Sequence, residues 1–173
     1  RARSAEEPDA PLLFGVQADY AMFGEGHRTT RHDLDRVMPD RPFAMFAADH
    51  HTIWANTRAL EAAGLLQGGA TEPGSEIVMG EDGLAEGELR EPGAYARVLA
   101  MTPHGGRDLA GLVTGKDPVP AASVAERGRD LDALRRGLAH CASYGITGLH
   151  NMDGNFYTME LLAELEADGE LPC

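Results

Sequence analysis

Short apolar runs and amphipathic segments alternate along the first part of the chain. The runs 11–17 (PLLFGVQ) and 43–48 (FAMFAA) predict strands. The second run lacks polar alternation, as expected for a strand buried on both faces of a parallel sheet. Between them, Thr30 suits the N-cap of a helix over 31–37. The pattern therefore predicts a strand, a helix and a second strand in succession.

Two further helices are predicted from their capping residues. Asn56 can cap a helix over 57–63, which Gly64 ends. Ser123 and Glu126 form a capping box at the start of the most clearly periodic helix. The expected apolar stripe of that helix consists of Val124, Leu131, Leu134, Leu138 and Cys141.

The remaining segments complete an α/β order. Residues 65–90 are rich in Gly and Glu and predict a hairpin or an excursion from the main sheet. Glu91 and Pro92 suit a helix start, 146–150 (ITGLH) predicts a strand, and 157–167 predicts a last helix. This order predicts parallel strands connected by crossover helices.

The composition excludes some partners. A formal net charge of −13 over 173 residues argues against binding to nucleic acid, which depends on clustered Lys and Arg. No apolar run approaches the roughly 20 residues of a membrane helix, so no membrane partner is expected. Cys141 and Cys173 have neither metal-type spacing nor the number for a disulfide framework, which favours a reducing compartment and a cytoplasmic location.

Polar side chains directly follow two of the predicted strands. If both strands run parallel in one sheet, these groups lie at the same edge, where imidazole and carboxylate groups could bind a divalent metal or transfer protons. A structural interpretation as turn formers and helix caps carries comparable weight. The residues are Asp49, His50 and His51 after the first strand, and His150, Asn151 and Asp153 after the second.

Three other residues have both a structural and a functional interpretation. Trp54 is the only tryptophan and is favoured as a packing residue over a pocket residue. The helix-cap role is sufficient for Asn56. Glu91 is either a pocket residue or a favourable charge at a helix N-terminus.

Three stretches together resemble amidohydrolase family 3, the YtcJ-like metal-dependent hydrolases. The main stretch is 31–65, RHDLDRVMPDRPFAMFAADHHTIWANTRALEAAGL, which is similar to a family segment with a strand, D-G-H, W-x-N and an AL…AG helix. The others are 82–91, similar to the family's G-x-x-x-G-x-L-x-E, and 144–153, similar to its GIT strand followed by an acid.

The resemblance implies an α/β fold, namely a partial (β/α)8 TIM barrel with an inserted hairpin or loop segment. It implies a single central fragment over 1–173, with a strand-to-helix pocket segment at about 30–56, an insert at 65–120 and a helix-strand-helix segment at 123–170. The implied pocket candidates are Asp49, His51, Trp54, Asn56, Glu91, His150 and Asp153; no catalytic residue is assigned.

The resemblance also implies hydrolysis of carbon–nitrogen bonds in small non-peptide amides, with a divalent metal, expected to be zinc, in the full-length parent. The sequence has no His-x-His pair, so no metal site is expected within this chain. His50 stands where the family usually has Gly, and His150 precedes Asn151 where an acid is more usual. Gly would permit a positive φ at position 50, so His50 predicts an altered turn or a changed pocket.

Two alternatives to the hydrolase fragment remain open. One is a non-enzymatic binding or interaction module derived from the same fold. The other is a small zinc protein that uses His50 or His51 together with His150 and Asp153. Because a partial barrel exposes sheet edges and apolar surface, the isolated chain is expected to self-associate.

Overall fold

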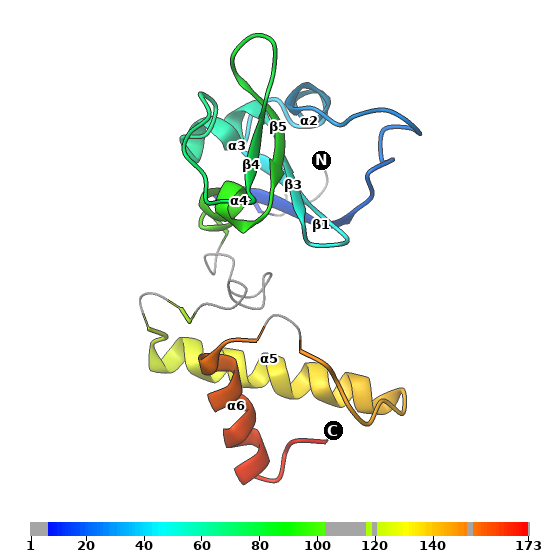
Figure 1. The fold of residues 1–173 in the computed structure, drawn as a ribbon, viewed down its shortest axis with the longest axis vertical. Helices are drawn as coiled ribbons and strands as arrows, with labels where there is room; N and C mark the ends of the chain where they lie inside the picture. The colour runs from blue at the N-terminus through cyan, green and yellow to red at the C-terminus, as the bar shows by residue number, and fades with distance from the viewer. Residues whose placement is uncertain (1–6, 103–116, 119–120, 152–153, 173) are drawn as a thin grey trace. The chain divides into compact units, whose positions relative to one another are not determined.

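The computed structural model describes residues 7–102, 117–118, 121–151 and 154–172. The chain forms two compact units, residues 1–106 and 107–173 (Figure 1), which are described separately below. The boundary falls inside the predicted insert 65–120, so the hairpin of that insert belongs to the first unit.

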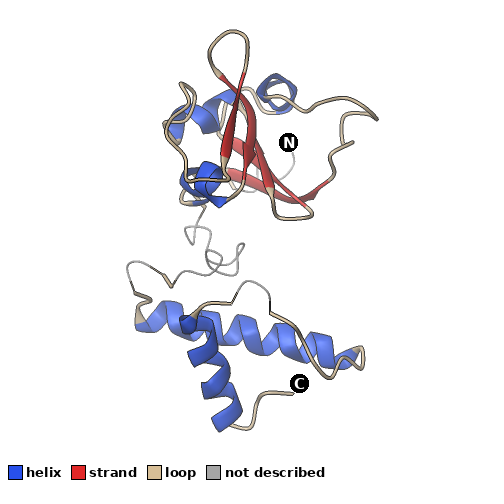
Figure 2. Cartoon of the chain, in the orientation of Figure 1, coloured by secondary structure: helices blue, strands red, loops and turns tan. Residues whose placement is uncertain are grey.

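The first unit contains a mixed five-stranded sheet, whose strands are red in Figure 2. The strand order is β1-β2-β3-β5-β4. Its strands are β1 (Leu13–Ala18), β2 (Phe43–Ala47), β3 (Thr52–Ala55), β4 (Glu76–Met79) and β5 (Ala85–Arg90). Only β1 and β2 are parallel; the other three neighbouring pairs are antiparallel. The fold is thus a mixed α/β fold, and the expected parallel order is wrong beyond the first pair.

A strand that the sequence pattern did not indicate causes this difference. Residues 52–55 form β3 and pair antiparallel with β2, with Met45 opposite Trp54. Only the four residues 48–51 connect the two strands, which suits a hairpin and is too short for a parallel crossover. The Asp-His-His segment therefore lies in a hairpin turn and not in a strand-to-helix loop.

Three helices pack on this sheet, and local signals define their ends. They are α2 (Arg31–Val37), α3 (Thr57–Ala62) and α4 (Pro92–Leu99). At α2, the Asp33 carboxylate accepts hydrogen bonds from both the N–H and the hydroxyl of Thr30. The Asn56 side chain accepts from the N–H of Ala59 at α3, and α4 begins with Pro92. The predicted helix starts are confirmed.

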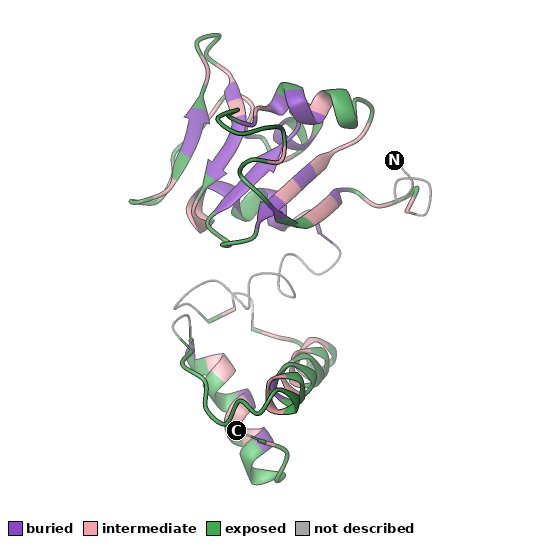
Figure 3. Ribbon diagram, turned by 90° about the vertical axis from the view of Figure 1, so that its right-hand side faces the viewer, coloured by how far each residue is buried: buried purple, intermediate pink, exposed green. Residues whose placement is uncertain are grey.

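The sheet is covered on both faces (Figure 3). On one face, Leu34 of α2 and Trp54 belong to a cluster against which Met45 packs. On the other face, the ring of Phe46 contacts Tyr95 of α4. All four residues of β3 are buried, as expected for a strand in the middle of a covered sheet.

Gly87 allows α2 to approach the sheet closely. It has a φ of +110°, and a Cβ at this position would lie 2.6 Å from the backbone N of Arg31 and 2.8 Å from the O of Ala55. Other residues rarely adopt this conformation and would also clash with the backbone. The position therefore requires glycine.

The second unit contains α5 (Val124–Ser143) and α6 (Phe156–Ala167). The Ser123–Glu126 capping box is present, which confirms the predicted start of α5. Leu138 of α5 and Leu161 and Leu165 of α6 are buried. Ion pairs connect Arg127 with Glu164 and Arg135 with Glu170, each at 2.6 Å.

The strand predicted in this unit is wrong. Residues 146–150 form no strand, and Ile146 and Leu149 are exposed. A strand needs a hydrogen-bonded neighbour, and all strands assigned in the described residues lie in the first unit. The expected apolar stripe of α5 is confirmed except at its first position. Leu138 is buried and Leu131, Leu134 and Cys141 are half-buried, whereas Val124 is 91% exposed.

Candidate functional site

Three backbone segments meet at one end of the sheet in the first unit. Because β1 and β2 are parallel, their carboxyl ends lie together, and the N–H of Ala48 donates to the O of Ala18 at 3.0 Å. The turn 48–51 leads into β3, where Thr52 lies opposite Arg90 of β5. The N–H of Glu91 then donates to the O of His51 at 2.9 Å. Polar side chains from all three segments gather at this sheet end.

Asp49 lies in the turn and is held by two donors. The Tyr20 hydroxyl lies 3.1 Å from its Oδ2 and 2.9 Å from Oγ1 of Thr52. The backbone N–H of His51 donates to Oδ1 at 3.1 Å. This N–H bond, with the Tyr20 contact, outweighs desolvation and holds the pKa of Asp49 below its usual value. Asp49 is thus a fixed, exposed carboxylate.

Tyr20 connects this carboxylate to the core. Its ring packs edge-on against Trp54, with the centroids 4.9 Å apart, and Trp54 is only 2% exposed. Desolvation by burial, together with the neighbouring Asp49, raises the pKa of Tyr20 despite its contact with Thr52. Its hydroxyl therefore remains a hydrogen-bond donor at neutral pH. The sequence pattern gave no signal for Tyr20, since its partner Asp49 is 29 residues away.

The side chains of His51 and Glu91 contact each other beside Asp49. Nδ1 of His51 lies 3.1 Å and 3.3 Å from the two carboxylate oxygens of Glu91. Because a carboxylate only accepts, Nδ1 carries the hydrogen, and Nε2 of neutral His51 is left as an acceptor. The side chains are 66% and 41% exposed, so the pair contributes little stability but is accessible to a ligand.

Backbone strain is concentrated at this sheet end. Gln17, His50 and Glu91 have φ values of 62°, 67° and 65°, and they are the non-glycine residues with positive φ in the described part of the chain. Such conformations cost about 1–3 kcal/mol each and often mark functional sites. His50 thus adopts a backbone conformation that favours Gly.

Trp54 and Asn56 lie in the core. Trp54 packs between Tyr20 and the cluster that includes Leu34, as the packing interpretation predicted. Asn56 has no exposed surface. Its Oδ1 accepts from the N–H groups of Phe43 and Ala59, and its Nδ2 donates to the O atoms of Met38 and Arg41. These four bonds account for its whole hydrogen-bonding capacity.

The second set of predicted residues belongs to the second unit. His150 is exposed in a segment of the second unit that forms no strand, so the shared sheet edge expected for it is wrong. Asp153 lies outside the described residues. Among the residues described, no group of three or more His, Cys, Asp or Glu side chains could hold a metal ion.

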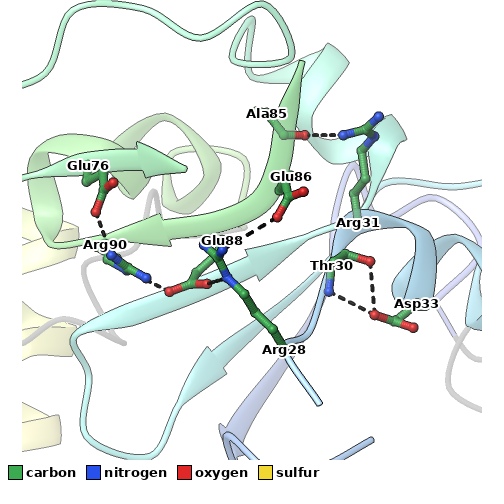
Figure 4. A network of polar contacts seen from close by, with 9 residues as sticks. All are labelled: Arg28, Thr30, Arg31, Asp33, Glu76, Ala85, Glu86, Glu88 and Arg90. Atoms are coloured by element: carbon green, nitrogen blue, oxygen red, sulfur yellow. Dashed lines mark hydrogen bonds and ion pairs between the residues drawn. The ribbon is translucent and has the colours of Figure 1, made fainter. Parts of the chain in front are cut away.

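A separate charge network lies between α2 and the β4–β5 hairpin (Figure 4). Glu88 is buried and binds Nε of Arg28 at 3.0 Å and Nε of Arg90 at 2.6 Å. Arg90 also binds Glu76 at 2.6 Å, and Arg31 donates to the O of Ala85. Because Glu88 is paired on both sides, the network has a structural explanation.

The fold and this sheet end define a mixed α/β protein with an exposed carboxylate and imidazole site. The family model described as "Amidohydrolase family" matches residues 1–173, and the chain belongs to this family. A protein of Bacillus subtilis (strain 168) named "Putative amidohydrolase YtcJ" is 28% identical over 177 residues. That match covers 99% of this chain and 30% of the relative, so the chain spans less than a third of that protein's length.

Two solved structures are also similar to this chain. They are crystal structures of uncharacterized metal-dependent hydrolases from Pyrococcus horikoshii OT3 and Pyrococcus furiosus, 19% and 20% identical, with TM-scores of 0.43 and 0.41. Each match covers 94% of this chain and 26% or 27% of the other. Within the described residues, no helix combines the length and apolarity needed to cross a membrane.

Proposed function

We propose that this chain supplies part of the substrate pocket of a longer metal-dependent hydrolase that cleaves carbon–nitrogen bonds in small non-peptide amides. Family membership supports hydrolysis as the reaction class, and the coverage of 30% of the relative supports a longer parent. In this proposal, the parallel pair β1 and β2 belongs to a (β/α)8 barrel, and the β4–β5 hairpin belongs to its insert.

The observation that carries the proposal is the convergence of Asp49, His51 and Glu91 at one sheet end. Asp49 is oriented by Tyr20 and can accept a hydrogen bond from an amide N–H of the substrate. Glu91 holds the His51 ring so that Nε2 can accept a proton or a hydrogen bond. Both groups are exposed and fixed by neighbours, as a substrate-orienting site requires.

The expected divalent metal, proposed to be zinc, does not fit the described residues. They offer no group of three suitable ligands, and the His51–Glu91 pair supplies at most two. The metal would therefore be held by residues outside the described part of the chain. The role proposed here for Asp49, His51 and Glu91 is to bind and orient substrate.

The test is amide hydrolysis by the full-length protein, followed through the amine released from a panel of small N-acyl amines. We expect His51→Ala and Glu91→Gln each to lower kcat/KM by about 10²-fold or more. Two exposed residues elsewhere provide matched controls, His32→Ala on α2 and Glu61→Gln on α3. Hydrolysis by both site variants within about twofold of wild type would refute the pocket assignment.

Self-association of the isolated chain and a cytoplasmic location remain parts of the proposal. Self-association is supported by large apolar side chains that are exposed in the second unit, and by Val16 and Met79 on the two edge strands. Light scattering over a concentration series tests it, and a constant monomer mass would contradict it. The exposed residues of the second unit are Val124, Tyr144, Ile146, Leu149, Phe156 and Met159.

A further inference from the structure

His50 occupies a backbone position that does not require histidine. It lies in the turn between β2 and β3 with a φ of +67°, in the left-handed region that favours Gly. Its neighbours in sequence, Asp49 and His51, are both members of the site. A strained residue within a polar cluster raises the question of what its side chain contributes.

The imidazole of His50 is held in place by aromatic packing. It stacks on Phe46 with the ring centroids 4.9 Å apart and the planes 27° apart. Phe46 in turn contacts Tyr95 at 5.5 Å, and the Tyr95 hydroxyl donates to the backbone O of His50 at 2.9 Å. Both the turn and the ring are therefore positioned before any ligand arrives.

The hydrogen-bonding groups of this ring are available. His50 is exposed, and in the described part of the chain no hydrogen bond or ion pair to either ring nitrogen is present. His51, by contrast, is engaged by Glu91. An oriented imidazole loses little freedom on binding, so its hydrogen bond to a ligand would count nearly fully toward affinity.

We propose that His50 is a specificity-determining residue, whose imidazole hydrogen-bonds a polar group of the substrate beside Asp49 and the His51–Glu91 pair. The inference rests on the proposed function, since it assigns the ligand of His50 to the same amide substrates. It predicts that His50 contributes to substrate binding and not to the chemical step.

Three variants separate hydrogen bonding from packing. His50→Phe keeps a ring that can stack on Phe46 but has no nitrogen. His50→Asn tolerates positive φ and restores a hydrogen-bonding group, whereas His50→Gly removes strain and side chain together. We expect the Phe and Gly variants of the full-length protein to raise KM about 3- to 10-fold with kcat within about twofold, and the Asn variant to recover part of the loss.

The outcomes also separate this inference from the proposed function. If wild type hydrolyses amides and the Phe variant keeps its KM, the inference fails and the function stands. If wild type hydrolyses none, the function fails, and NMR titration of wild type and His50→Phe with N-methylacetamide decides the inference. Weaker binding by the variant supports His50 as a ligand group, and equal binding or none overturns it.

Discussion

Asn56 offers a sharp test of the fold, because one buried side chain connects three parts of the first unit. It caps α3 through Ala59, fixes the start of β2 through Phe43, and binds the backbone O atoms of Met38 and Arg41. Its replacement by Ala leaves two N–H groups and two carbonyl groups without these partners, at a position where Asn56 itself has no exposed surface.

The expected loss follows from these four bonds. Each contributes about 0.5–1.5 kcal/mol net, and the loss of an N-cap alone costs about 1 kcal/mol. We expect Asn56→Ala to lower the free energy of unfolding by about 3–5 kcal/mol, a large part of the roughly 5–15 kcal/mol of a typical domain. Asn56→Asp should be no better, because a carboxylate would face two carbonyl oxygens.

The single tryptophan provides the assay. Trp54 is buried in β3, so its fluorescence during urea titration of the chain, at one fixed concentration, reports unfolding of the first unit. Asp35→Ala is the control, since Asp35 binds the N–H and hydroxyl of Thr57 at the start of α3 from a less buried position. We expect that control to lose about 1 kcal/mol. An Asn56→Ala variant no less stable than the control would refute the reasoning.

Three further variants test other features of the first unit. Gly87→Ala places a Cβ 2.6 Å from a backbone nitrogen of α2 at a φ of +110°, and we expect it to destabilise by at least about 2 kcal/mol in urea titration. Desolvation alone would raise the pKa of Asp33, but the hydrogen bonds from His27 and Thr30 together outweigh it and hold this pKa below its usual value. The Asp33 carboxylate therefore contributes its full stabilisation of the folded state above about pH 3.9, and this contribution is lost as pH falls through the lower folded-state pKa. The stability difference between wild type and Asp33→Asn should shrink with that fall, and a constant difference from pH 7 to 2 would contradict this. Tyr20→Phe removes a hydrogen bond that lowers the pKa of Asp49, so carboxyl NMR titration should show that pKa rise, and an unchanged value would exclude the contact.

Helix starts were predictable because their signals lie within four residues. Asn56 and the N–H that it caps are three positions apart, and the same holds for Ser123 and Glu126. The strands β1 and β2 were indicated by short apolar runs, and the hairpin of β4 and β5 was one of two interpretations of the Gly-rich segment 65–90. Such features follow from local hydrogen bonds and periodicity, which a sequence displays directly.

Strand pairing was less predictable because it depends on distant partners. The α/β order favours parallel neighbours, but the short turn 48–51 makes β2 and β3 a hairpin and reverses the expected direction of pairing. Residues 146–150 have strand-like composition, yet no described strand pairs with them. Composition does not determine whether a neighbouring strand is present, and β propensity depends strongly on packing against such neighbours.

The site was predictable in its residue types but not in its geometry. The Asp-His-His segment and Glu91 were visible in the sequence, while their meeting requires β5 to lie beside β3. Tyr20 was missed because nothing near it in sequence marks a contact with the turn. The role of Asn56 could be inferred as a helix cap, but its three other hydrogen bonds come from segments up to 18 residues away.

Backbone conformation gives the strongest reason to regard this sheet end as functional. Glu91 has a φ of 65° and a ψ of 158°, a region that is almost restricted to Gly, and His50 lies in the left-handed region beside it. Stability alone would favour Gly at both positions. The Glu91 carboxylate contacts an exposed imidazole, a pair of little value to stability. The strain at these two residues therefore supports a role for their side chains in binding a ligand.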